Sequence, residues 1–286
     1  MRRTVIVTLL LSVVGAVYWI AQAGNLEPPG PPGPTMKTLD EVEPRFLIRQ
    51  GDLPLTITIP GSYYVMEDLA GGSGGITIDT VCVTIDLNGF ALFGGAAGSG
   101  ITAGAFSENI EIKNGVVAGW PVHGIDLTQA ANSRVLDVRV TDNGENGVIL
   151  GDDSLLVNSV VNRNGDNGVY LPGARSVVAD CLISNNVSDG VETLGDGHQL
   201  KENSILGNQA IGILVPDFSD SHIIVDNTFT NNVSYSIFTG EFSVGHVVTR
   251  NVGTRAAGVN FLNLSGDWGP IGPAATSTSP WANISN

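Results

Sequence analysis

Positive charge is scarce in this chain of 286 residues, which has 13 Lys and Arg residues against 28 Asp and Glu residues and a formal net charge of −15 at pH 7. Nucleic acids and anionic membrane surfaces are bound through basic patches. The composition therefore excludes both as partners. A polyanionic polysaccharide stays open only where a local basic patch or a bridging cation offsets the negative charge.

Several signatures of catalysis and of helical structure are also missing. The sequence has no phosphate-cradling glycine loop, no zinc signature and no nucleophile elbow. No apolar pattern of 3.6 residues persists after residue 35, and short β-branched runs alternate with Gly, Asn and Asp instead. These absences favour an all-β chain and give no direct indication of an enzyme class.

The N-terminus has the pattern of an export signal. Arg2 and Arg3 precede an apolar run that ends at Ile20, and Ala21 and Ala23 place small residues at a cleavage site. We expect residues 1–23 to be a signal peptide and the mature protein to be secreted, periplasmic or at the cell surface, with membrane contact only through an uncleaved signal. Residues 24–49, which contain EPPGPPGPT, are predicted to form a Pro/Gly-rich linker and N-terminal lead.

From there the sequence is repetitive, because a glycine followed by Ile or Val returns every 21 to 25 residues. These marks are Gly75, Gly100, Gly124, Gly147, Gly168, Gly190, Gly212 and Gly258, with Ser236 in place of one glycine. Apolar residues recur one position after each mark and seven and twelve positions before it. The pattern predicts three short strands per repeat, each with an inward side chain.

Polar residues recur with the same period. Asparagine stands four positions before five consecutive marks, from Asn143 to Asn232, and Asn, Asp or Glu stands ten positions before six marks, from Asn114 to Asp226. Asn and Asp tolerate a left-handed backbone and bond to their own turns. Stacked in register, their amides can also pair from coil to coil. We therefore predict corners at these positions and an asparagine ladder.

A leucine-rich repeat is the alternative repeat architecture. Val135, Val138, Val140 and Asn143 match its core pattern. The following repeats break the match, because Ser159, Cys181, Asn203 and Asn227 replace the second apolar position. The segments left for a helical back are also too short.

These columns resemble right-handed parallel β-helix repeat proteins of the pectate-lyase-like superfamily. The flanking segments 34–45, 59–69 and 280–285 are similar to those of an exported bacterial branch, for which the resemblance implies no particular activity. It implies an all-β, single-stranded right-handed parallel β-helix (solenoid) of about nine three-strand coils. The β-helix would span residues 50–262 including an N-terminal cap, residues 263–286 would form a C-terminal cap or tail, and the protein would be a monomer.

The expected coil spacing separates the two cysteines. Cys82 and Cys181 lie four coils apart, roughly 19 Å at about 4.8 Å per coil. A disulfide needs Cα atoms within about 7 Å of each other. We expect two free, buried thiols.

Outward-facing residues two positions after each mark are candidates for ligand binding. Tyr170 beside Glu192 could stack on a sugar and accept its hydroxyl groups, and Asp126 shares their column. These three residues are the predicted substrate-binding residues.

The turn after that strand suggests an alternative, enzymatic site. In enzymes of the pectate-lyase-like superfamily, Ca²⁺ bound by an acidic cluster neutralises the carboxylate of a uronate, and Arg, Lys or His removes a proton. In this chain, Asp152, Asp153 and Asp196 could hold Ca²⁺ through their oxygen atoms, and Arg175 or His198 could be the base. No family motif is matched residue by residue, so these roles are not carried over from the family. The remaining histidines share no repeat position and are expected to be isolated: His123, His222 and His246.

Two functions follow from the sequence, which leaves open whether the chain is an enzyme. The first is an exported β-helix that binds, or is displayed on, an extracellular polysaccharide or cell-surface glycan without catalysis. The regular coils favour it, because catalytic clefts in this architecture are usually walled by long loops. The second is a polysaccharide lyase or epimerase that acts on uronate polymers by Ca²⁺-assisted β-elimination. No cofactor is certain, and Ca²⁺ belongs only to the second function.

Overall fold

The computed structural model describes residues 44–254, 260–263, 268, 270–272 and 279–285. The predicted signal peptide (1–23) and residues 24–43 of the predicted linker lie outside the described residues. The chain divides into two units, Met1–Pro44 and Arg45–Asn286, and the second carries every described strand. Within the described ranges, no helix has the length and apolarity needed to cross a bilayer.

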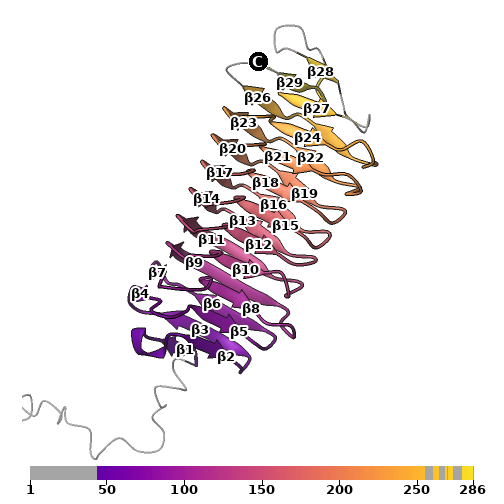
Figure 1. The fold of residues 1–286 in the computed structure, drawn as a ribbon. Helices are drawn as coiled ribbons and strands as arrows, with labels where there is room; N and C mark the ends of the chain where they lie inside the picture. Colours follow the sequence, from indigo (N-terminus) through magenta and orange to yellow (C-terminus); the bar gives the residue numbers. More distant parts are fainter. Residues whose placement is uncertain (1–43, 255–259, 264–267, 269, 273–278, 286) are drawn as a thin grey trace, which may run out of the picture. The chain divides into compact units, whose positions relative to one another are not determined.

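The second unit is a parallel β-helix in which each coil contributes one short strand to each of three faces (Figure 1). One face is a ten-stranded parallel sheet: β2 (Leu55–Ile57), β5 (Ile76–Ile78), β8 (Ile101–Ala103), β10 (Ile125–Leu127), β12 (Val148–Leu150), β15 (Val169–Leu171), β18 (Val191–Thr193), β21 (Ile213–Val215), β24 (Ile237–Thr239) and β27 (Phe261–Asn263). We call it the ten-stranded face.

The other two faces belong to one continuous sheet of 19 strands. The second face contains β1 (Phe46–Ile48), β3 (Gly61–Val65), β6 (Val83–Asp86), β9 (Ile110–Ala118), β11 (Arg134–Thr141), β13 (Leu155–Val157), β16 (Val177–Ala179), β19 (Gln199–Lys201), β22 (Ile223–Val225) and β25 (Val247–Thr249). The third contains β4 (Leu69–Ala70), β7 (Ala91–Phe93), β14 (Val160–Asn162), β17 (Leu182–Ser184), β20 (Ser204–Leu206), β23 (Thr228–Thr230), β26 (Val252–Thr254), β28 (Ile271–Gly272) and β29 (Asn283–Ser285). Strands β9 and β11 continue across both faces, and the short 3₁₀ helix η1 (Gln50–Asp52) follows β1.

The register confirms the predicted parallel β-helix. Residues one position after the marks pair between neighbouring coils, as Ile125 does with Val148 and Val169 with Val191. One mark was wrong: Ile237 pairs with Phe261, so Asn260, and not Gly258, follows Ser236 in register. A Gly-Val pair two residues earlier imitates the pattern, and Leu262 takes the outward position that the sequence assigned to Asn260.

The recurring glycines are required by close packing between coils. A Cβ atom on Gly147 would lie 2.5 Å from Cγ1 of Val161 and 2.6 Å from the amide nitrogen of Asn164. Both neighbours are fully buried, so they have no room to move. Glycine is therefore required at position 147, because inward side chains occupy the space that a larger residue would need.

Each coil turns at left-handed residues, as predicted for the column ten positions before the mark. That column has positive φ throughout, for example 53° at Asp137 and 54° at Asp180. A second such column runs through Asp142 and Asn185, and a third through Asp153. The residue after a left-handed corner points into the core, and in many coils that residue is polar, as Ser159, Asn186 and Asn203 are.

These inward polar residues form three hydrogen-bonded columns. The first is the predicted asparagine ladder, in which Nδ2 of Asn186 donates to Oδ1 of Asn208 (2.9 Å). The second consists of the residues that break the match to a leucine-rich repeat: the backbone N–H of Cys181 donates to Oδ1 of Asn203 (3.0 Å), and asparagines continue the column from there. Its members are Ser159, Cys181, Asn203, Asn227, Asn251 and Asn283.

The third column corrects the prediction that the histidines share no repeat position. Nδ1 of His198 accepts the backbone N–H of Ser176 (3.1 Å), and Nδ1 of His222 accepts that of His198 (3.1 Å). The rings of His198, His222 and His246 stack in parallel with centroids 5.3 and 5.2 Å apart. Ser133, Ser154 and Ser176 fill the earlier positions of this column.

Both cysteines are free thiols, as predicted, but only one is buried. Cys181 belongs to the second ladder, and burial raises the pKa of its thiol to about 12. Cys82 is exposed, because it occupies a left-handed corner (φ 56°) rather than the inward position after it.

Candidate functional site

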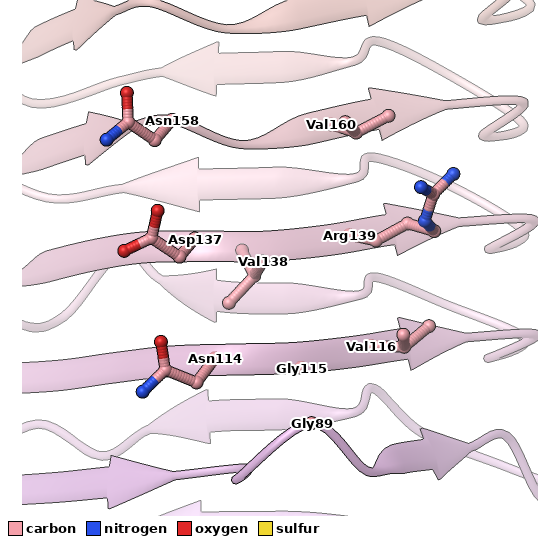
Figure 2. A pocket seen from close by; sticks show the side chains of 9 residues that line it. All are labelled: Gly89, Asn114, Gly115, Val116, Asp137, Val138, Arg139, Asn158 and Val160. Atoms are coloured by element: carbon pink, nitrogen blue, oxygen red, sulfur yellow. The ribbon is translucent and has the colours of Figure 1, made fainter.

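A groove of about 410 Å³ lies at the corner between the second and third faces, where β9, β11 and β14 stack. Figure 2 shows its side chains in two columns that run from coil to coil. Its lining residues are Gly89, Asn114, Gly115, Val116, Asp137, Val138, Arg139, Asn158 and Val160. We call it the elbow groove.

The hollow follows from the alternation of side chains along each strand. Residues at i and i+2 point outward and the residue between them points inward, so Asp137 and Arg139 flank the groove while Val138 is buried. Gly115 holds the inward position one coil earlier, where a Cβ would lie 2.3 Å from Cβ of Leu87. Gly115 therefore adds no side chain to the floor of the groove.

One wall of the groove is polar. Asn114, Asp137 and Asn158 occupy successive left-handed corners with φ between 51° and 57°. Nδ2 of Asn114 donates to Oδ1 of Asp86 (3.2 Å), which leaves its carbonyl oxygen available to a ligand. The wall presents amide, carboxylate and amide groups in adjacent coils.

The opposite wall is mainly apolar, with Arg139 between Val116 and Val160, its register partners in the neighbouring coils. Arg139 is exposed. Among the described residues, neither Arg139 nor Asp137 forms an ion pair, and their charges balance within the groove. This site was not predicted from the sequence, because the corner positions of Asn114, Asp137 and Asn158 already account for their residue types.

The structure brings two of the three predicted substrate-binding residues together. Tyr170 and Glu192 are direct neighbours on the ten-stranded face. Burial raises the pKa of Glu192 while a hydrogen bond from Nδ2 of Asn167 (2.7 Å) opposes the shift, and burial together with Glu192 raises the pKa of Tyr170. Asp126 lies two coils away from Tyr170, and its Oδ1 accepts both the backbone N–H and the hydroxyl of Thr128.

A buried carboxyl group lies beside this pair. Asp189 is 6% exposed, and burial raises its pKa to about 6, with smaller contributions from Glu192 and Asp166. Its Oδ1 accepts the backbone N–H of Ile211 (2.7 Å). The group therefore holds the next coil in place.

The residues of the predicted uronate site are occupied with structural contacts. Arg175 makes two 2.7 Å hydrogen bonds to the carboxylate of Asp153. Oδ1 of Asp152 accepts the backbone N–H of Ala174, and Oδ1 of Asp196 accepts that of Asp220, both at 2.8 Å.

His198, the other predicted base, is fully buried in the histidine column rather than exposed beside Arg175. Burial lowers its pKa to about 4. In the part of the chain that the structure describes, no group of three or more His, Cys, Asp or Glu side chains could hold a metal ion. The predicted Ca²⁺ ligands Asp152, Asp153 and Asp196 thus do not converge.

The chain matches the model of a known protein family. A family model described as "Periplasmic copper-binding protein (NosD)" matches residues 92–249, more than half of the chain. No curated protein matches the chain at a significant level.

Solved structures share the fold at low sequence identity. The Dettilon tailspike protein has a TM-score of 0.56 and 14% identity, over 84% of this chain and 60% of that one. The enzymatically active domain of tailspike protein 2 from bacteriophage CBA120 has a TM-score of 0.54 and 14% identity, over 76% of this chain and 42% of that one. The chain thus spans about two fifths to three fifths of the length of these tailspike chains.

Proposed function

The chain belongs to the NosD family, described as periplasmic copper-binding protein, and within that family we propose that it is an exported β-helix protein that binds an extracellular glycan without cleaving it. The elbow groove is the proposed binding site. The observation that carries this proposal is the pairing of a polar wall with an apolar wall in one groove.

A sugar ring suits such a groove because it has apolar C–H faces and polar hydroxyl edges. Val116 and Val160 offer apolar contact, whereas Asn114 and Asn158 can both donate and accept hydrogen bonds and Asp137 can accept them. The volume of 410 Å³ lies within the range of about 300–1,000 Å³ typical of small-molecule sites. The columns repeat from coil to coil, which suits a chain of sugars better than a compact ligand.

Tyr170 and Glu192 remain proposed sugar contacts on the ten-stranded face. Their phenol and carboxylate lie side by side and partly exposed. Asp126 is less suited to such contact, because its carboxylate already bonds to its own turn.

Non-catalytic binding is favoured over β-elimination by the contacts of the charged groups. Elimination from a uronate needs a free base and a cation near the substrate carboxylate. Arg175 is bound by Asp153, and His198 lies in the core with its pKa lowered. His198 is not accessible to a polymer on the surface, and Arg175 would have to leave its ion pair with Asp153 to act as a base.

The copper in the family description has no matching cluster of His, Cys, Asp or Glu ligands among the described residues. Copper is bound by imidazole nitrogen and by the sulfur of Cys or Met. Nδ1 of His198, His222 and His246 accepts backbone N–H groups, Nε2 of His222 lies 2.7 Å from Oγ of Ser219, and the rings stack in parallel rather than converge. We derive no function through copper.

Glycan binding is testable with one substitution and a matched control. Asp137→Gly removes the carboxylate from the groove and keeps a residue that accepts a positive φ. Asp180→Gly makes the same change in the same column outside the groove. In co-sedimentation with insoluble pectate, alginate, cellulose and chitin, we expect Asp137→Gly to lose binding and Asp180→Gly to retain it.

Two outcomes contradict the proposal. Equal retention of both variants would exclude the elbow groove, and failure of the unsubstituted protein to bind any of the four polymers would exclude glycan binding. Unsaturated-uronate absorbance that appears with Ca²⁺ and is lost in Arg175→Ala would instead establish a lyase.

A further inference from the structure

Two phenylalanine rings are stacked on the surface, far from the elbow groove in the chain. Phe218 and Phe242 are 75% and 58% exposed, and their rings lie 5.5 Å apart at an interplanar angle of 8°. Each is the third residue after its strand, in the turns that follow β21 and β24. Phe218 and Phe242 form what we call the apolar stack.

Phe218 occupies this position against its backbone preference. Its φ of 64° lies in the left-handed region, which is unfavourable for a bulky side chain. Exposing a ring to water is unfavourable as well. Backbone strain of this kind is found where the surrounding structure and a functional demand both maintain it.

The turns that carry the stack are fixed by hydrogen bonds. Oδ1 of Asp217 accepts the backbone N–H of Phe242 (3.3 Å), and Oδ1 of Asp220 accepts that of Val244 (2.7 Å). The rings are thus presented on an ordered surface, which lowers the entropy cost of binding a ligand.

The surroundings of the stack are acidic. Asp196, Asp217 and Glu241 are exposed in the same turns, and the segments 194–197, 216–221 and 240–245 contain no Lys or Arg. A ligand with carboxylate or phosphate groups would be repelled here, whereas hydroxyl or amino groups would find acceptors.

We propose that the apolar stack is a second glycan-contact surface and that the glycan it takes carries no negative charge. The C–H faces of sugar rings lie on Phe218 and Phe242 while hydroxyl groups donate to the neighbouring carboxylates. This rests on the proposed glycan binding and adds the class of polymer, which excludes pectate and alginate as ligands of this surface.

The test compares a double substitution in the stack with a control on an isolated ring. Phe218→Gly/Phe242→Ser removes both rings, and glycine relieves the left-handed strain at position 218. Phe106→Ser removes a ring that is 82% exposed in the equivalent turn after β8. Each variant is sedimented with cellulose, chitin, pectate and alginate, and its thermal midpoint and sedimentation coefficient are measured.

We expect the double variant to bind cellulose or chitin about tenfold more weakly or worse, as for the loss of an aromatic anchor. Phe106→Ser should bind like the unsubstituted protein. The double variant should keep or raise the thermal midpoint, which separates lost binding from lost folding.

Three results overturn the inference while leaving the proposed function intact. One is undiminished binding of the double variant to polymers that Asp137→Gly no longer binds. Another is binding confined to pectate or alginate. A third is an oligomer of the unsubstituted protein that the double variant alone abolishes without a change in glycan binding, which would make the stack a contact between copies of the chain. Binding to none of the four polymers overturns the proposed function itself.

Discussion

The histidine column makes the stability of this β-helix depend on pH, and one substitution should reduce that dependence. His198 is fully buried, and burial lowers its pKa from about 6.5 to about 4. The neutral imidazole is required, because its Nδ1 accepts the backbone N–H of Ser176. Protonation would place an additional charge and a donor where an acceptor is needed.

The direction of the pKa shift determines whether the stability rises or falls with pH. A histidine whose pKa is lower in the folded state binds its proton more readily after unfolding, so its contribution is complete above pH 6.5 and is lost as the pH falls toward 4. A difference of about 2.5 pKa units corresponds to about 3 kcal/mol of unfolding free energy. His222, whose pKa is lowered to about 3 by burial and by its histidine neighbours, adds a loss in the same direction.

Urea unfolding at pH 7.5 and at pH 4.5 measures this effect. His198→Asn keeps an acceptor for the N–H of Ser176, as asparagine does in the other two columns, but does not titrate. Between the two pH values, the unsubstituted protein should lose about 2–3 kcal/mol more stability than His198→Asn. His123→Asn is the control, because His123 lies outside the column: its Nε2 pairs with the exposed Glu145 (3.4 Å), and its Nδ1 accepts the backbone N–H of Asn146 (3.3 Å), which asparagine can also accept. An identical pH dependence in all three proteins would refute the reasoning.

Three further predictions test the stacking of coils. Asn186→Ala leaves the backbone N–H and the side-chain amide of Asn164 without their acceptor, so it should lower the unfolding free energy by about 2–5 kcal/mol. In the same denaturant titration, Asn185→Gly at the adjacent left-handed corner should be nearly neutral. Gly195→Ala would bring a Cβ within 1.7 Å of the carbonyl oxygen of Gly173 and should abolish folding or lower the thermal midpoint by more than 10 °C, while Gly72→Ala, with open space around it, should not. A thiol reagent should modify one cysteine, Cys82, in the native protein and two after unfolding; rapid native labelling of Cys181 would contradict its burial.

The repeat could be predicted from sequence because its physical requirements fix residue types. Val148, Val169 and Val191 must all be apolar, since each points into a core that excludes water. The glycine marks are fixed by contact with the next coil, and Asn164, Asn186 and Asn208 pair like with like. Where one residue type meets the requirement in every coil, the same amino acid recurs at that position and the column can be recognised in the sequence.

The other two polar columns were missed because several residue types meet the same requirement. What they share is an atom that accepts a backbone N–H from the preceding coil. Oγ of Ser176 and Nδ1 of His198 do this in one column, and Oγ of Ser159 and Oδ1 of Asn203 do it in the other. A search for columns of acceptors, rather than of one amino acid, would have found them.

The same requirement explains why acidic turns are weak indicators of function in this architecture. A carboxylate in a turn can serve to accept a backbone N–H group one coil away rather than to bind a ligand. Asp152, Asp196 and Asp217 each accept such a group. The stronger indicator is a polar side chain that neither the ladders nor the turns use. Asp137 and Arg139 meet that criterion among the described residues, two positions apart on β11 and across a floor that Gly115 leaves open. The proposed binding groove is therefore marked by two charged residues that neither the ladders nor the turns of the β-helix use.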